Sequence, residues 1–129
     1  MEQRFRKINY RILILILVFI MSFSLNINSL SAIENKDTKL IDKISKDYTK
    51  KFCNSIAFGL SKESAMNFSI AENKQVFKNK KGIKTINKEL LAEEIAISTI
   101  ENCGFQINLY GQKGIEEFKN YYLAKDKGS

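Results

Sequence analysis

The only thiols of the chain are Cys53 and Cys103, and their chemistry depends on where the chain works. Two cysteines in an exported chain favour one structural disulfide. Two free, buried thiols that pack as small apolar side chains are the alternative in a compartment that is not strongly oxidising. A redox or metal-binding role has less support, because the cysteines do not form a Cys-x-x-Cys pair and no histidine completes a ligand set.

Paired carboxylates are the second candidate for chemistry. A glycosidase needs two carboxylates across a cleft, and a di-iron bundle needs Glu-x-x-His pairs that a chain without histidine cannot form. The candidate pairs are Glu89 with Glu93, Glu94 with Glu101, and Glu116 with Glu117. We expect these acids to line exposed helix faces and to balance neighbouring lysines. The missing histidine also excludes a Ser-His-Asp triad and a Cys-His pair, so we expect no enzyme and no catalytic, metal-binding or cofactor-binding residues.

The end of the chain carries a glycine-rich segment and several aromatic residues. Gly111-Gln112-Lys113-Gly114 precedes a predicted helix, whose first amides would attract an anion. The segment lacks the GxxxxGK[ST] pattern, so Gly114 is more simply a turn residue at the helix start. Aromatic side chains often dominate binding energy, and four of them are candidate interface anchors: Phe105, Tyr110, Tyr121 and Tyr122. Packing in the core explains these aromatic residues about as well.

The first part of the chain has the order of a secretory signal peptide. Residues 1–11 are basic, residues 12–25 form an apolar run of 14 residues, and residues 26–32 are small or polar. The run is shorter than the about 20 residues of a spanning helix. We expect cleavage after Ser31 or Ala32, with an uncleaved anchor over residues 12–25 as the alternative. Either way the rest of the chain faces a periplasm, a lumen or the medium.

The exported part, residues 33–129, predicts a single small domain with an all-α fold. Apolar residues at three- and four-residue steps predict about four helices, over residues 38–60, 61–78, 87–103 and 115–124. The first helix has one apolar stripe formed by Ile41, Ile44, Tyr48 and Phe52. The third helix is apolar over more than half its girth and is expected at the centre of the core.

Polar residues and glycines predict where these helices begin and end. Candidate N-caps are Asp37, Ser61 and Asn87. Gly82 is the expected turn of a linker over residues 79–86. Gly104 suits the left-handed position after the third helix, with Phe105 folding back near Ile100 and a short extended piece over residues 106–109.

The charge of the exported part is mildly basic, with 17 basic and 13 acidic residues. The densest basic stretch consists of Lys78, Lys80, Lys81 and Lys84 around Gly82. No aromatic residues interleave these lysines as stacking platforms, so we expect a solvated loop and no nucleic-acid partner. An anionic lipid surface or an acidic protein surface is the alternative partner of this loop.

Two stretches, residues 52–74 and 86–118, resemble small exported proteins of cyanobacteria and plastids. The resemblance covers about half the chain and is carried by Cys53-Asn54, Phe58-Gly59, Cys103-Gly104 and the segment 111–114. Such proteins occupy the thylakoid lumen or the periplasm, so the resemblance implies a lumenal accessory protein near photosynthetic membranes. No catalytic motif comes with it.

Together these features favour an exported, non-enzymatic accessory protein that binds a protein or membrane complex. Peripheral membrane association is compatible with this interpretation. The alternative is a secreted binding protein of the small-molecule or effector type, which would use a pocket between its helices.

Overall fold

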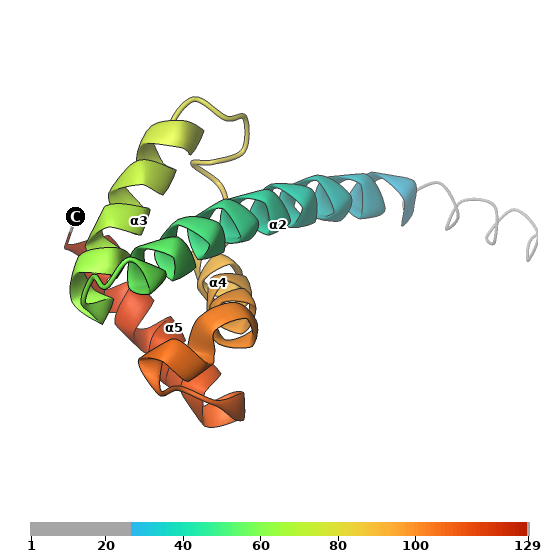
Figure 1. Cartoon of the computed structure of the whole chain (residues 1–129). Helices are drawn as coiled ribbons and strands as arrows, with labels where there is room; N and C mark the ends of the chain where they lie inside the picture. Colours follow the sequence, from blue (N-terminus) through green and yellow to red (C-terminus); the bar gives the residue numbers. More distant parts are fainter. Residues whose placement is uncertain (1–26, 129) are drawn as a thin grey trace, which may run out of the picture. The chain divides into compact units, whose positions relative to one another are not determined.

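A computed structural model describes the backbone of residues 27–128 and the side chains of residues 37–128. This part of the chain is helical and contains no strand, which confirms the predicted all-α fold (Figure 1). The elements are α2 (Ile27–Ala57), α3 (Lys62–Phe77), α4 (Lys88–Cys103), the short 3-10 helix η1 (Gly104–Ile107) and α5 (Gly111–Lys127). Most of the predicted signal peptide lies outside the described residues. None of the described helices is long and apolar enough to cross a bilayer. Residues 37–128 form one compact unit.

The predicted start of the first helix is wrong, because α2 already includes Asp37 and begins at Ile27. No glycine or proline interrupts residues 27–57, so the helix continues through the position where a cap was expected. Its end comes at Ala57, three residues before the predicted Leu60. Gly59 has a φ of +88° there, and the amide of Leu60 donates to the carbonyl of Ser55 at 3.0 Å. This pattern is a Schellman cap, in which glycine takes the left-handed position.

The core forms where the apolar stripe of α2 meets α5. The predicted stripe is buried, and Tyr48 and Phe52 are completely inaccessible to solvent. The ring of Tyr48 lies edge-on to that of Tyr122 at 5.3 Å, and the ring of Phe52 lies edge-on to that of Phe118 at 5.2 Å. Aromatic rings prefer such edge-to-face contacts because their faces and edges carry opposite partial charges. Two pairs of rings therefore join α2 to α5.

Helix α4 contributes a second buried face to the core, but fewer of its apolar residues are buried than the sequence predicts. The buried residues are Leu91, Ala92, Ile95, Ala96, Thr99 and Cys103. Leu90 is 52% exposed, and Ile97 and Ile100 are partly exposed. Helix α4 also packs against α5.

The predicted caps of α3 and α4 are confirmed. The side chain of Ser61 accepts a hydrogen bond from the amide of Ser64. The side chain of Asn87 accepts from the amides of Glu89 and Leu90 at 3.0 and 3.1 Å. Each cap satisfies backbone donors that the first helical turn leaves unpaired.

The segment between α4 and α5 differs from its prediction. Gly104 is right-handed with a φ of −57°, and the left-handed residue is Asn108 with a φ of 58°. The expected extended piece is instead η1 followed by a turn. Phe105 does not fold back on Ile100, since its side chain is 83% exposed.

The glycine at position 104 is explained by a close approach of two backbones rather than by its dihedral angles. A Cβ atom there would lie 2.5 Å from the carbonyl oxygen of Leu109. Gly114 serves the same purpose on α5, because its Cβ would lie 2.9 Å from the carbonyl carbon of Leu109. Gly114 is thus a buried residue inside α5, not a turn residue, and α5 begins four residues earlier than the predicted Ile115. Leu109, 9% exposed, is enclosed between the two glycines.

Candidate functional site

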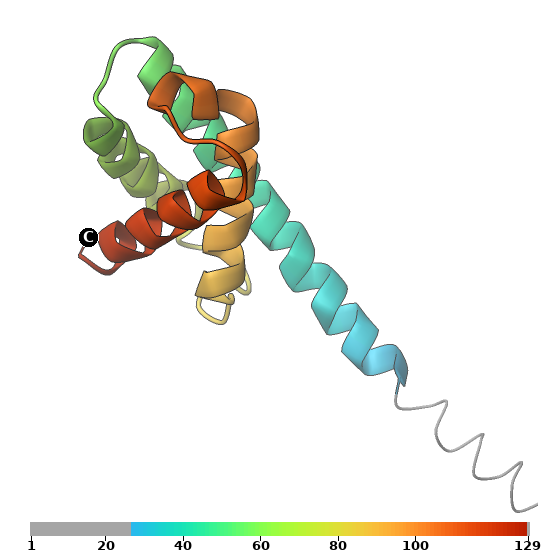
Figure 2. The same cartoon turned by 90° about the horizontal axis from the view of Figure 1, so that it is seen from below.

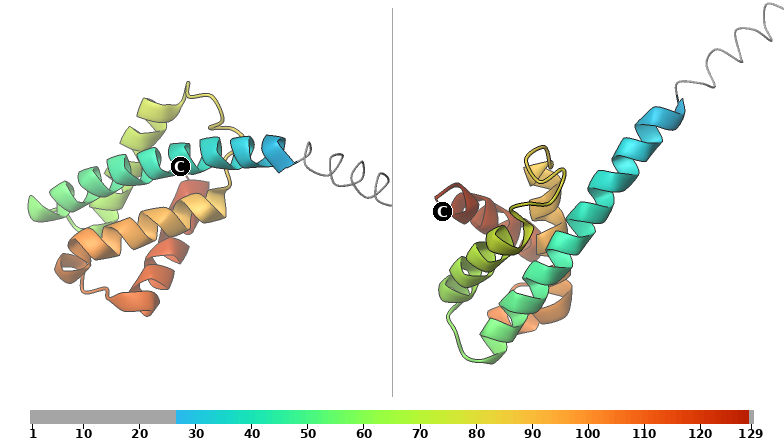
Figure 3. Two further views of the ribbon diagram at one scale, coloured as in Figure 1. Left: turned by 90° about the vertical axis from the view of Figure 1, so that its right-hand side faces the viewer. Right: turned by 90° about the horizontal axis from the view of Figure 1, so that it is seen from above.

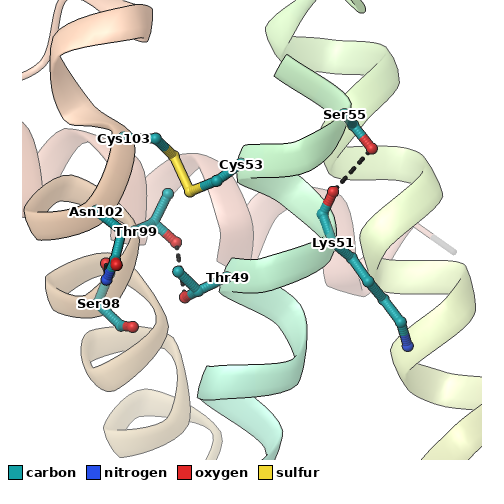
Figure 4. Close-up of a disulfide and its surroundings, with 8 residues drawn as sticks. All are labelled: Thr49, Lys51, Cys53, Ser55, Ser98, Thr99, Asn102 and Cys103. Carbon is teal, nitrogen blue, oxygen red and sulfur yellow. Dashed lines mark hydrogen bonds between the residues drawn. A yellow bond between two sulfur atoms is a disulfide. The ribbon is translucent and has the colours of Figure 1, made fainter. Parts of the chain in front are cut away.

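Cys53 and Cys103 form a disulfide that joins the last turns of α2 and α4 (Figure 4). Their Cα atoms are 5.7 Å apart, and no cysteine remains free. One helical turn earlier on each helix, the hydroxyl oxygens of Thr49 and Thr99 lie 3.3 Å apart in a buried hydrogen bond. The structural disulfide predicted from the sequence is therefore confirmed. Within residues 37–128 no group of three or more acidic or cysteine side chains is placed to hold a metal ion.

The disulfide holds together two segments that expose aromatic side chains. Phe58 follows α2 and is 85% exposed, and Phe105 follows Cys103 and is 83% exposed. The ring of Phe105 lies 6.5 Å from that of Tyr110, which is 55% exposed. The turn after α2 and η1 occupy the same end of the bundle in each view (Figures 2 and 3). We call this end, with Phe58, Phe105 and Tyr110, the aromatic end.

The four predicted interface anchors thus fall into two groups. Phe105 and Tyr110 lie on the aromatic end. Tyr122 is a core residue, 6% exposed, and burial raises its pKa far above the usual value for a tyrosine. Tyr121 is partly exposed, and the ammonium groups of Lys62 and Lys125 lie 5.5 and 5.7 Å from its ring centre. Tyr122 is consequently not available to a partner.

Phe58 is the most exposed of the aromatic residues that were not predicted as anchors. The sequence does contain a pattern that predicts the exposure of Phe58. Phe58 falls outside the buried stripe of α2, and the following glycine ends the helix. A large apolar side chain at such a position has no helix face to cover it.

A pocket lies beneath the linker between α3 and α4, and none of the residues that line it belongs to the aromatic end. Its volume is about 320 Å³, and it is partly open to solvent. Apolar side chains from α2, α3, the linker and α4 form most of its wall: Ile44, Ile70, Phe77, Ile83, Ile86 and Leu91. Four lysines also line it, namely Lys74, Lys78, Lys84 and Lys88. We call it the lysine-rimmed pocket.

Polar groups at the wall of this pocket are held by defined partners. Asn73 is 5% exposed, and its amide nitrogen donates to the carbonyl of Ile44 at 3.1 Å. The Asp126 carboxylate contacts the ammonium groups of Lys74 and Lys88, each at 3.1 Å. Burial alone would raise the pKa of Asp126, but the hydrogen bonds and charges of the two lysines outweigh burial and lower it.

The predicted acid pairs are exposed or partly exposed, and several of them face lysines. Lys119 contacts Glu93 at 3.2 Å and Glu89 at 4.0 Å, and Lys62 contacts Glu117 at 3.9 Å. Ion pairs this exposed contribute little to stability, on the order of 0–1 kcal/mol each. The placement agrees with the expectation that these acids balance neighbouring lysines on helix faces.

Comparisons of the chain with protein-family models, with curated proteins and with solved structures found no match.

Proposed function

We propose that this chain is an exported, non-enzymatic accessory protein that docks onto a protein partner through its aromatic end. The observation that carries the proposal is the exposure of Phe58 and Phe105, at 85% and 83%, on two segments joined by the disulfide. Large aromatic side chains at the centre of an interface often dominate its binding energy. The disulfide restrains both segments before binding, which lowers the entropy lost when the partner docks.

The charges near the aromatic end favour a protein partner over an anionic bilayer. The charged residues nearest in sequence to these aromatic residues have mixed signs: Glu101, Lys113 and Glu116 near Phe105 and Tyr110, and Lys51, Lys62 and Glu63 near Phe58. Attraction to an anionic membrane surface needs a cluster of basic residues, at about 1 kcal/mol for each lysine near the surface. An apolar centre surrounded by mixed charges is instead typical of protein interfaces.

The expected address of the protein supports the same proposal. The basic, apolar and small segments of residues 1–32 favour export, and disulfides persist in oxidising compartments. The resemblance to thylakoid-lumen and periplasmic proteins suggests a partner in or near a photosynthetic complex. The absence of histidine in the sequence is the reason for proposing a binding protein rather than an enzyme.

Native-gel migration of the full chain, tagged at its C-terminus and expressed in the source organism, tests the proposal. Gently solubilised membranes and soluble fractions would be compared for the unchanged chain and for the double variant Phe58→Ser/Phe105→Ser. We expect the unchanged chain to migrate with a larger complex and the double variant to migrate as a small free species.

Val76→Ser is the matched control, because Val76 is 49% exposed and lies at the other end of α3. This variant should migrate with the complex. The proposal fails if the unchanged chain is found only as a small species, or if the double variant remains in the complex.

A further inference from the structure

We infer that the lysine-rimmed pocket binds a single-chain anionic amphiphile, whose aliphatic chain enters the pocket and whose carboxylate or phosphate head contacts Lys78 and Lys84. This site is separate from the aromatic end, and the inference does not depend on the function proposed above.

The interior of the pocket suits an aliphatic chain. Four different elements supply its apolar wall, and Phe77 and Leu91 are themselves 5% and 8% exposed. The volume of about 320 Å³ is at the lower end of the range for ligand pockets, roughly 300–1,000 Å³. A pocket of this size accommodates one chain better than the two chains of a bilayer lipid.

The charges at the pocket select the sign of the head group. Four lysines line the pocket against one acid, Asp126. That acid contacts Lys74 and Lys88, so its charge is already neutralised by these two. The ammonium group of Lys78 donates to the neutral side chain of Gln75 at 3.2 Å, and Lys84 has no acidic partner within residues 37–128. Lys78 and Lys84 thus lie beside an apolar cavity without an acidic partner, and an anionic head group would neutralise their charge.

The linker that carries Lys84 consists of hydrogen-bonded turns. Successive turns give it internal hydrogen bonds, from the amide of Ile83 to the carbonyl of Lys80 at 3.2 Å and from that of Thr85 to Gly82 at 3.1 Å. Gly82 has a φ of +91°, which an L side chain rarely adopts. A wall that is formed before binding costs less ordering entropy when a ligand enters.

Titration calorimetry of the full chain with three decyl probes below their micelle concentrations tests the inference. The probes are decanoate, decyl phosphate and decyltrimethylammonium, which share one chain and differ in the charge of the head group. We expect the two anions to bind and the cation to bind more weakly. Equal or tighter binding of the cation would overturn the inference.

A pair of lysine variants separates the pocket from the general positive charge of the linker. Lys78→Gln/Lys84→Gln removes two lysines of the pocket, whereas Lys80→Gln/Lys81→Gln removes two lysines of the same linker that do not line it. Both variants change the net charge equally and sit at exposed positions, so both should fold. We expect decanoate affinity to fall roughly fivefold in the first variant and to stay near that of the unchanged chain in the second. Equal affinities of the two variants would overturn the inference, as would an absence of anion binding by the unchanged chain.

Flotation with vesicles distinguishes the two sources of such an amphiphile. Co-flotation with phosphatidylcholine vesicles that contain lysophosphatidylglycerol but not with pure phosphatidylcholine vesicles, lost in Lys78→Gln/Lys84→Gln, would support the pocket and assign it to a single-chain membrane lipid. Decanoate binding without flotation would support it and assign it to free fatty acids. The Phe58→Ser/Phe105→Ser variant should bind decanoate normally, so failure of either proposal can be recognised without the other.

Discussion

The hydroxyl groups of Thr49 and Thr99 share a buried hydrogen bond one helical turn before the disulfide of Cys53 and Cys103 (Figure 4). Both pairs are four residues apart on their own helices, so α2 and α4 run in the same direction along this contact (Figure 3). One polar and one covalent link therefore fix the register of two helices whose ends carry Phe58 and Phe105. The aromatic end depends on this contact for its geometry.

Replacing either threonine by valine should destabilise the fold more than replacing both. Thr49 and Thr99 are 5% and 0% exposed, so a single substitution leaves one hydroxyl buried beside an apolar group. Leaving a buried polar group unpaired costs about 1–3 kcal/mol, whereas removing both partners can be nearly neutral. Urea unfolding of Thr49→Val, Thr99→Val and the double variant measures this coupling. Simple additivity of the two single effects would contradict a direct bond between the hydroxyls.

Removing the disulfide should lower the free energy of unfolding by up to about 4 kcal/mol, the chain-entropy value for a separation of 50 residues. Thermal unfolding with and without a thiol reductant measures the effect. The Cys53→Ser/Cys103→Ser variant supplies the control, because its unfolding should not respond to reductant. An unchanged transition after verified reduction would mean that the helix packing alone sets stability.

Substitution of Gly104 by alanine should destabilise the segment between α4 and α5. The added Cβ would lie 2.5 Å from the carbonyl oxygen of Leu109, and overpacking of this kind typically costs about 1–3 kcal/mol. Gly128→Ala is the matched control, since the nearest atom to its Cβ is at 3.8 Å, an ordinary contact. Chemical denaturation should show a loss for the first variant and little change for the second. A neutral Gly104→Ala would imply that Leu109 moves freely.

The regular part of this fold could be predicted from local patterns. The stripe of Tyr48 and Phe52 follows from three- and four-residue spacing, and the caps at Ser61 and Asn87 follow from short polar side chains that bond nearby amides. The disulfide followed from the number of cysteines and the expected compartment. Each of these inferences uses residues close together in the sequence or a property of the whole chain.

The parts that could not be predicted depend on contacts between distant segments. Gly104 looked like a left-handed cap, but its lack of a side chain accommodates the backbone of Leu109 instead. The residues that line the lysine-rimmed pocket extend from Ile44 to Asp126, so no local window of sequence contains it. The position of Phe58 outside the apolar stripe and before Gly59 indicates only that its own helix does not cover it, and the packed structure shows that no other segment covers it either.

The cluster of Asp126 with Lys74 and Lys88 should make stability depend on pH at the acid end. The two lysines lower the pKa of Asp126 in the folded protein below its value in the unfolded chain, about 3.9. A carboxyl group with a lowered folded pKa stabilises the fold above its unfolded pKa. That contribution is lost as the pH falls through the folded value.

Asp126→Asn should therefore reduce stability at neutral pH by up to about 1 kcal/mol and flatten the loss of stability below pH 4. Lys88→Gln removes one of the groups that lower the pKa of Asp126, so it should partly reduce the loss of stability below pH 4. Lys80→Gln removes the same charge as Lys88→Gln but lies outside this cluster. Its stability should therefore depend on pH as steeply as that of the unchanged chain. Urea unfolding at a series of pH values between 2 and 7 compares the four proteins. If Asp126→Asn and the unchanged chain lose stability in parallel through the acid range, the lysines do not hold this carboxylate in its charged form. Asp126 would then not offset the positive charge of the lysines that line the pocket.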